Sequence, residues 1–309
     1  MLSPSRLRLL LELRDRGTIA AVANAFSYTP SAISQQLNQL EVEAHVELTR
    51  PAGRGVELTP QGILLCDHAE RILTAVETAE ADVAAWSRTV KGTLRIGVFQ
   101  SAAIAIVPRV LRVLAGDYPA LRVQMTEILS YTSLQQLSAH RFDLIASEEY
   151  PGFPGSRSDL FHREEFADDA LKLVVPDSWS VDPVMGELRR RPWVMEEPDS
   201  EPGLWALAEC RRAGFEPDIA YRSSDLVVQA SLIREGMAVA VLPSLVLATT
   251  PNQGLRVGDL AGQPRRRIYT MVRAGAEGRP DVQAFRQALR RGSGEIAGVR
   301  QPVALHPAT

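Results

Sequence analysis

Apolar residues recur at helical spacing through the first part of the chain. One such run spans residues 3–16 and ends before Gly17, the kind of residue that commonly follows a helix. A second run spans residues 18–26, and a third begins at Thr29 and Pro30, the pair expected at an N-cap and a first helical position. The pattern therefore predicts three short helices joined by tight turns.

The third of these helices has an apolar face and an opposite face with almost no charge. At about 100° per residue, Ile33, Leu37 and Leu40 share the buried face. The outer face carries short polar and methyl-bearing side chains, namely Ser31, Ala32, Ser34, Gln35 and Asn38. Amides can form bidentate bonds with adenine, serine can bond to bases or phosphate, and a methyl group can pack on thymine.

On an isolated helix such a face is more often a plain solvent surface than a DNA contact. Here two helices and a turn precede the third helix, which makes DNA contact the favoured interpretation. Their spacing is that of a helix-turn-helix, in which the second of two packed helices enters the major groove of DNA.

The segment after the third helix predicts a small hairpin. Its sequence, LTRPAGRGVELTPQG, predicts a strand, a turn and a second strand, and it carries Arg50 and Arg54. These arginines are placed to reach phosphates or an adjacent minor groove, where a guanidinium matches the negative potential. The predicted DNA contacts are Thr29, Pro30, Ser31, Ala32, Ser34, Gln35, Asn38, Arg50 and Arg54.

Residues 7–73 together resemble the winged helix-turn-helix of the LysR-type transcriptional regulators, with TPSAISQQLNQLE in the position of the recognition helix. The resemblance implies a regulator that binds double-stranded promoter DNA as a homodimer or homotetramer and is not an enzyme. The family often has arginine where this chain has Gln35, so no base preference is implied. A net charge of −3 excludes a generally basic nucleic-acid coat, so affinity is expected to come from placement and dimerisation.

A long helix is predicted after Thr59 and Pro60, running to about residue 87. Apolar residues alternate steps of four and three along it, which is the heptad pattern of a two-helix coiled coil. They form a predicted dimer seam of Leu65, Ala69, Ile72, Val76, Ala79, Val83 and Trp86. A single helix packed on its own domain is the less favoured alternative, because acidic residues keep the flanks polar.

Beyond residue 92 the pattern changes to strands that alternate with helices. The strands TLRIGVF, PALRVQMTE and FDLIAS, with a helix at 103–114, predict a mostly parallel sheet with helical crossovers. A second unit starts at about residue 168, and the chain returns to the first at RRIYTMVR. Two lobes joined in this way make a cleft. They resemble the family's periplasmic-binding-protein-like effector domain, above all at EGMAVAVLPS.

The predicted fold is therefore α/β, with an N-terminal all-α winged helix-turn-helix, a long linker helix and a two-lobed effector domain. The expected ranges are 1–59 for the DNA-binding domain, 60–88 for the linker helix, 89–92 for a hinge and 93–292 for the effector domain. Lobe I is expected at 93–165 and 268–292, lobe II at 166–267, and a disordered tail at 293–309.

Ligands of open α/β sheets bind at the carboxyl ends of strands, next to helix N-termini. Four loops of this chain qualify. Each alone is more often a cap or turn than a ligand contact, but together they match where the family binds its inducers. The predicted effector contacts are Gln100, Ser101, Ala102, Ser130, Tyr131, Thr132, Glu148, Glu149, Tyr150, Ser224 and Asp225. A serine for a carboxylate and glutamates for an ammonium group favour an amino-acid-like or amine-bearing small-molecule effector.

Composition excludes several other classes of protein. At 309 residues and 45% hydrophobic, the chain can bury a sizeable core. Charged residues interrupt the N-terminal leucine run, and the longest apolar stretch, near 237–248, is too short for a bilayer. We therefore expect no signal peptide, no membrane span and a cytoplasmic location. Cys66 and Cys210 lie far apart, which favours free thiols, with a redox switch as the minor alternative.

Catalytic and metal-binding patterns are not recognisable. The five histidines show no metal-ligand spacing, no Gly-x-Ser-x-Gly motif occurs, and GSGEIAG has no preceding strand to make it a dinucleotide loop. We expect no catalytic residue, no metal and no cofactor. The rival from another class is a stand-alone small-molecule receptor or transport-type binding protein, and the winged helix weighs against it.

Overall fold

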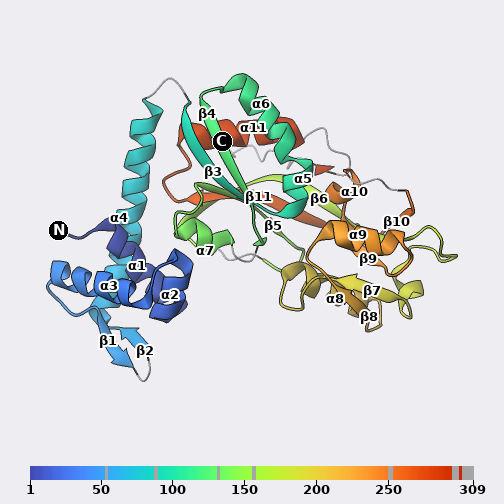
Figure 1. Ribbon diagram of the computed structural model, residues 1–309, viewed down its shortest axis with the longest axis horizontal. Coiled ribbons are helices and arrows are strands. Elements are labelled where there is room, and N and C mark those ends of the chain that lie inside the picture. The colour runs from blue at the N-terminus through green and yellow to red at the C-terminus, as the bar shows by residue number, and fades with distance from the viewer. Residues whose placement is uncertain are drawn as a thin grey trace, which may run out of the picture.

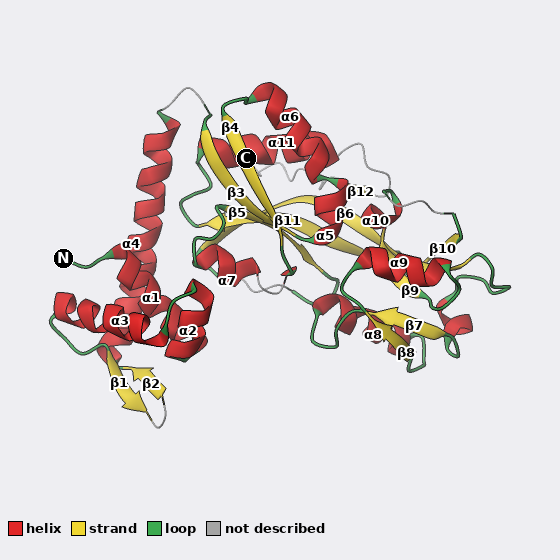
Figure 2. Ribbon diagram, viewed as in Figure 1, coloured by secondary structure: helices red, strands yellow, loops and turns green. Residues whose placement is uncertain are grey.

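The computed structural model describes residues 1–52, 55–86, 90–130, 133–154, 158–249, 253–293 and 299–300 (Figure 1). A small helical unit comes first, a long helix follows it, and two α/β lobes make up the rest (Figure 2). This order confirms the predicted fold class.

The first unit consists of three helices and a two-stranded wing. The helices are α1 (Pro4–Arg16), α2 (Ile19–Phe26) and α3 (Pro30–Ala44), and the antiparallel wing strands are β1 (Thr49–Ala52) and β2 (Gly55–Leu58). Helices α2 and α3 begin as predicted, because the hydroxyls of Thr18 and Thr29 each accept a hydrogen bond from the N–H three residues on. The apolar stripes of all three helices meet in one core.

The linker helix α4 (Pro60–Ala85) begins at its predicted cap, Thr59, and packs its first turns against α1. Gly62 lets the start of α4 lie against the residue before β1, since a Cβ there would lie 2.2 Å from the carbonyl oxygen of Leu48. Ala69 is fully buried in the core of the first unit and Leu65 packs against it. The predicted dimer seam is therefore wrong at Ala69, because the start of α4 completes its own domain, and half-buried Leu65 stays a predicted seam residue.

The later seam residues lie clear of that core. Val76 is half-buried, and the exposed members are Ile72, Ala79, Val83 and Trp86. Residues 87–89, which include the start of the predicted hinge, lie outside the described part of the chain.

A mixed sheet runs through both lobes. Its members are β3 (Gly92–Val98), β4 (Leu121–Glu127), β5 (Leu144–Glu149), β6 (Phe161–Pro176), β9 (Ala240–Pro243), β10 (Leu255–Asp259), β11 (Arg265–Arg273) and β12 (Val299–Arg300). The order is β10-β6-β11-β5-β3-β4, with β9 and β12 also paired to β6. Strand β3 is parallel to β4 and β5, but β11 is antiparallel to β5 and β6.

The prediction of a mostly parallel sheet is therefore wrong. Strand β6, with 16 residues, continues from one lobe into the other, and β11 returns beside it in the opposite direction. Within this sheet the strand-helix rhythm holds only for β3, β4 and β5, which is why the local pattern predicted a parallel sheet.

Lobe I is built around β3, β4 and β5. Helices α5 (Gln100–Ala105), α6 (Val107–Asp117) and α11 (Pro280–Ser293) contribute to its main core, and α7 (Ser133–Ser138) packs in a second cluster. Lobe II contains the parallel pair β7 (Pro192–Met195) and β8 (Asp218–Arg222), a 3-10 helix (Met185–Leu188), α8 (Glu201–Arg212), α9 (Leu226–Arg234) and α10 (Ser244–Leu247). Its first cluster includes the buried Trp193 and Trp205.

Three further expectations concern the whole chain. No helix of the described residues is long and apolar enough to cross a membrane. Cys66 and Cys210 are both free and buried. Of the predicted tail, 299–300 forms β12 beside β6, and 294–298 and 301–309 lie outside the described residues.

Candidate functional site

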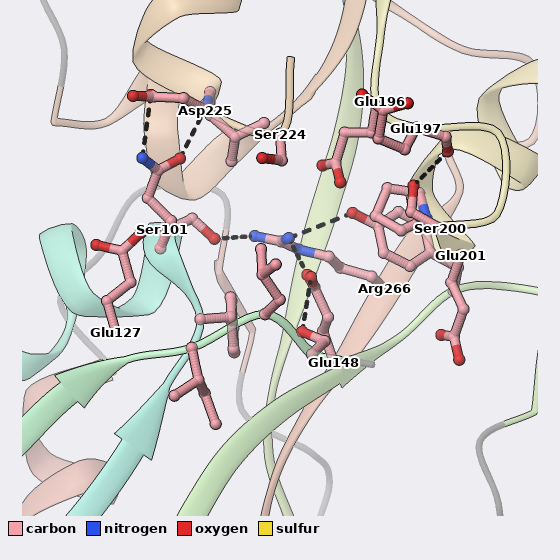
Figure 3. Close-up of a pocket in the computed structure, with 18 residues that line it drawn as sticks. Ser101, Glu127, Glu148, Glu196, Glu197, Ser200, Glu201, Ser224, Asp225 and Arg266 are labelled. Carbon is pink, nitrogen blue, oxygen red and sulfur yellow. Dashed lines mark hydrogen bonds and ion pairs between the residues drawn. The ribbon is translucent and has the colours of Figure 1, made fainter. Parts of the chain in front are cut away.

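A cavity of about 200 Å³ opens between the two lobes (Figure 3). From lobe I it is lined by residues at or just beyond the ends of β3, β4 and β5. From lobe II it is lined by the segment between β7 and α8 and by the start of α9. We call this cavity the cleft.

Arg266 lies at the cleft with its charge already paired. Its Nη1 forms an ion pair with Glu148 (Figure 3), while Nε and Nη2 donate to Asp169 Oδ2 at 3.0 and 2.7 Å. Nη2 also donates to Ser101 Oγ at 2.5 Å. Arg266 is 1% exposed and Asp169 0%. Because two carboxylates surround one guanidinium, Arg266 has no spare positive charge for a ligand.

Among the described residues that line the cleft, the remaining charged groups are all acidic. Besides Glu148, the carboxylates that line it are those of Glu127, Glu196, Glu197, Glu201 and Asp225. Burial, and then the nearby charge of Glu148, raise the pKa of Glu196 to about 8. The same two causes raise the pKa of Glu201. The cleft is therefore a region of negative potential, which attracts cations and repels anions.

Gln100 joins the two lobes across the cleft. Its Nε2 donates to Asp225 Oδ1 at 3.0 Å, and its Oε1 accepts from the backbone N–H of Leu226 at 2.8 Å. Asp225 in turn caps α9 by accepting from two backbone N–H groups. One amide side chain of lobe I thus holds the start of a lobe II helix.

The structure brings most of the predicted effector residues together. Those that line the cleft are Gln100, Ser101, Ser130, Glu148, Tyr150, Ser224 and Asp225. Ala102 instead packs in the core of lobe I, because it lies on the inner side of α5. Glu149 points away and pairs with Arg163 and Arg267, since neighbouring residues of a strand face opposite ways. Tyr131 and Thr132 lie outside the described residues.

Sequence reasoning missed several residues of the cleft. Glu127 ends β4 and Glu196 follows β7, so the rule of strand ends had the information to find both. Arg266 is different, because it lies inside an apparent core strand and nothing in its spacing marks it. Ser101 was expected to be available to a ligand, yet it is 1% exposed and its hydroxyl contacts Arg266.

The outer face of α3 is open, as its polar composition requires. Ser31, Gln35 and Asn38 are exposed, and Ala32 and Ser34 are half-buried. The face carries no charged side chain at these positions, so its amides and hydroxyls are free of competing ion pairs.

Other predicted DNA contacts have local partners. Thr29 is exposed and caps α3, and the exposed Pro30 accepts a hydrogen bond from Ser34 Oγ at 3.0 Å. On the wing, Arg50 Nε lies 2.5 Å from Glu57 Oε1, in a pair whose side chains are 60% and 50% exposed. Such an exposed pair is weak enough to be exchanged for a phosphate. Arg54 lies outside the described residues.

Comparison with known proteins matches both parts of the chain to one family. Residues 4–63 match the model described as "Bacterial regulatory helix-turn-helix protein, lysR family", and residues 87–294 match the "LysR substrate binding domain". The HTH-type transcriptional regulator DgdR of Burkholderia cepacia is 30% identical over 236 residues, which is 76% of each protein. The regulator TfdS of Cupriavidus pinatubonensis is 24% identical over 94% of this chain and 98% of its own.

Solved structures share the fold across the whole length. A full-length OxyR variant from Pseudomonas aeruginosa superposes with a TM-score of 0.66 at 16% identity, covering 98% of this chain and 99% of that one. Full-length CbnR in complex with its target DNA gives a TM-score of 0.52 at 23% identity, covering 94% and 99%. A helix-turn-helix with an uncharged outer face, a linker helix and a two-lobed domain with a cleft thus occur here in the arrangement of these regulators. The chain belongs to the LysR family of DNA-binding transcriptional regulators.

Proposed function

We propose that the cleft binds a small organic cation as effector and that its occupancy regulates promoter binding by α3 and the wing of a dimer. The observation that carries this proposal is the charge of the cleft, whose described lining has six carboxyl groups and one guanidinium, itself already paired. Among the described residues no group of three acidic, histidine or cysteine side chains is placed to hold a metal ion. The carboxylates are spread along the walls, which suits a cation of several atoms.

Of the two charged groups of the amino-acid-like effector expected from the sequence, the cleft favours the ammonium group over the carboxylate. A volume of about 200 Å³ suits a molecule of the size of a diamine or a basic amino acid. A carboxylate group is poorly served, because Ser101 is engaged by Arg266 and that arginine by Glu148 and Asp169. An ammonium group, in contrast, meets Glu196 and Glu201, neither of which has a cation within salt-bridge distance in the described chain.

We assign 1–59 to DNA binding, 60–88 to the linker helix, 89–92 to the hinge and 93–292 to effector binding, as expected from the sequence. A regulator of this plan acts in the cytoplasm, where promoter DNA lies, and needs no catalytic residue. The alternative of a stand-alone receptor or transport-type binding protein is not favoured, because residues 4–63 match the LysR helix-turn-helix.

Three five-carbon compounds that differ only in charge test the effector class. Cadaverine carries two ammonium groups, 5-aminopentanoate is a zwitterion, and glutarate carries two carboxylates. A ligand at a concentration of about 100 times its Kd raises the free energy of unfolding by roughly 2.7 kcal/mol. Cadaverine is therefore expected to raise Tm by about 5–10 °C. Glutarate is expected to have no effect, because the cleft repels it. Differential scanning fluorimetry of the full chain measures both.

Paired variants connect any stabilisation to the cleft. Glu201→Gln removes one cleft carboxylate and is expected to reduce the shift by at least half. Glu216→Gln removes an exposed carboxylate of lobe II, whose side chain is 68% exposed, and should leave the shift intact. Stabilisation by glutarate but not by cadaverine would contradict the cationic effector.

The pKa of Glu196 predicts how cation binding depends on pH. With that pKa at about 8, Glu196 is mostly protonated at pH 6.5 and ionised at pH 8.5. Because an ammonium group keeps its charge to about pH 10 and prefers the ionised carboxylate, affinity should rise with pH on the order of tenfold between these values. Calorimetric titration with the diamine checks this. Glu196→Gln should abolish the rise, and a persistent rise in that variant would place the titrating group elsewhere.

Gln35→Ala tests whether α3 reads bases. Gln35 is exposed at the centre of the outer face, so the substitution is expected to cost about 1–3 kcal/mol of specific binding and to relax preference at one base pair. Arg50→Ala on the wing should instead weaken all sequences alike and lower the salt dependence by about one unit. Fluorescence anisotropy with a footprinted promoter and its single-base variants separates the two. An unchanged base preference for Gln35→Ala would leave α3 with a plain solvent face.

A further inference from the structure

A buried ion pair attaches the linker helix to lobe I, at the end of β11 opposite to the cleft. Arg273 Nε donates to Glu77 Oε1 of α4 at 2.5 Å, and Arg273 Nη1 donates to the carbonyl oxygens of Leu137 and Phe142 at 3.2 and 2.8 Å. The Arg273 and Glu77 side chains are only 9% and 7% exposed. We call these four residues the clasp.

Glu77 is the residue of α4 that forms an ion pair with Arg273. Asp143 Oδ1 lies 4.0 Å from Arg273, and His140 Nε2 lies 3.5 Å from Glu77 Oε1. Burial, Arg273 and Arg8 of α1 lower the pKa of His140 to about 2, so its ring is neutral and does not compete for Glu77. A charged residue of the linker helix is therefore buried against a charged residue of lobe I.

Two more contacts bring the same surfaces together. A Cβ on Gly275 would lie 2.5 Å from the Thr78 hydroxyl and 2.6 Å from the Thr74 carbonyl oxygen, so the turn after β11 touches α4 where only glycine fits. Arg141, in the turn before β5, donates to the Ser27 hydroxyl at the end of α2. The first unit and α4 thus both meet lobe I beside the ends of β5 and β11.

Strands β5 and β11 each reach from the cleft to the clasp. Phe142 lies two residues before the start of β5, and Glu148 lies near the other end of the strand. Arg266 lies near the start of β11, and Arg273 is its last residue. The two strands are hydrogen-bonded neighbours over residues 267–271 of β11 and 145–149 of β5 (Figure 1). At about 3.4 Å per residue, the seven steps from Arg266 to Arg273 span roughly 24 Å.

We propose that the clasp is a regulatory contact, which holds the DNA-binding unit on lobe I and is coupled to the cleft through β5 and β11. The coupling rests on the proposed function, in which the cleft binds the effector. A cation that attracts Glu148 competes with Arg266 for that carboxylate, and these two residues belong to the strands that lead to the clasp. When α4 moves away from lobe I, Glu77 and Arg273 become hydrated, and this hydration offsets the loss of their ion pair. The clasp can therefore open and close.

Cross-linking of the full chain measures docking without any effector. Ser27→Cys and Arg141→Cys place two thiols across the interface, and a short bismaleimide joins them within one chain. Native Cys66 and Cys210 are both fully buried and do not compete. The rate of the intramolecular cross-link reports the docked fraction, and the mass of the product separates it from a link between chains.

Glu77→Met keeps the length of the side chain but removes its charge, and it is expected to slow this cross-link at least tenfold. Glu77→Gln, a milder change that retains an acceptor, should slow it by about threefold and serves if the first variant does not fold. The matched control is Asp82→Asn, which removes one charge from an exposed position of the same helix and should leave the rate within twofold.

The second arm tests the coupling from the far end. Glu148→Gln weakens the partner of Arg266 in the cleft and is expected to change the same rate at least threefold. An unchanged rate in the Glu77 variants would show that the clasp does not hold the unit, and an unchanged rate in Glu148→Gln would show that cleft and clasp are independent. Either result overturns the proposal. Because no effector is added, a wrong effector class leaves this test unaffected.

Discussion

Arg266→Met is expected to lower the free energy of unfolding of the two-lobed domain by about 3–5 kcal/mol. The variant leaves Glu148 and Asp169 without their guanidinium, and Asp169 is 0% exposed, so its charge has no access to water. For a domain of this size each kcal/mol moves Tm by about 2–4 °C, so Tm should fall by roughly 6–20 °C. Calorimetry of the full chain measures the loss.

The size of this loss should depend on pH. Burial raises the pKa of Asp169 even in the presence of Arg266, which opposes the rise. Without Arg266 the folded-state pKa rises further above the unfolded value of about 3.9. A carboxyl shifted in this direction costs nothing below the unfolded pKa, and its cost grows as pH rises toward the folded pKa. The variant should therefore be closest to the unmodified protein at about pH 4 and below, and furthest from it at pH 8.

Arg211→Met is the matched control for Arg266→Met. Arg211 pairs with Glu216 on the surface of lobe II, where the two side chains are 59% and 68% exposed. Water replaces the lost partner there, so Tm should not change measurably at any pH. If Tm fell equally in both variants, or if the fall for Arg266→Met did not depend on pH, loss of packing and not buried charge would be the cause of the lower Tm.

Local signals in the sequence were sufficient to predict the DNA-binding unit. The caps Thr18, Thr29 and Thr59 act within three residues of their own position, so they can be recognised without knowledge of the fold. The buried stripe of α3 likewise depends only on helical periodicity. The residues expected at the strand ends of the cleft were found for the same reason, since a strand and the loop after it are neighbours in sequence.

What the sequence did not predict depends on residues far apart in the chain. The charge of Arg266 is paired with Asp169, 97 positions away, and with Glu148, 118 positions away. Antiparallel pairing of β11 with β5 and β6 likewise joins segments that no local pattern connects. Ala69 fits a heptad seam in sequence, yet α1 covers it, because periodicity shows which side of a helix is apolar and not what lies on it.

The first half of α4 packs in the core of its own domain, so we expect the dimer to form through the second half of α4. LysR regulators form oligomers, and in this chain Val83 is 75% and Trp86 90% exposed on the same side of the linker helix. Apolar side chains of this size gain about 1.5–3 kcal/mol each when a partner helix covers them. Below them Ile72 is 37% exposed and belongs to the same stripe.

Val83→Asp is therefore expected to raise the dimer dissociation constant at least 100-fold, because a two-fold interface loses the valine twice and buries two like charges. Binding to DNA with two half-sites should fall with it, since the linker helices set the separation of the two copies of α3. Ala84→Asp is the control, because it adds the same charge at the next position on a different, exposed face of α4. Sedimentation velocity at micromolar concentration, with gel shifts on one and two half-sites, gives both quantities. If Val83→Asp stayed dimeric while Ala84→Asp dissociated, the partner would lie on the other side of α4, and if both stayed dimeric, the lobes and not the linker helix would hold the two chains together.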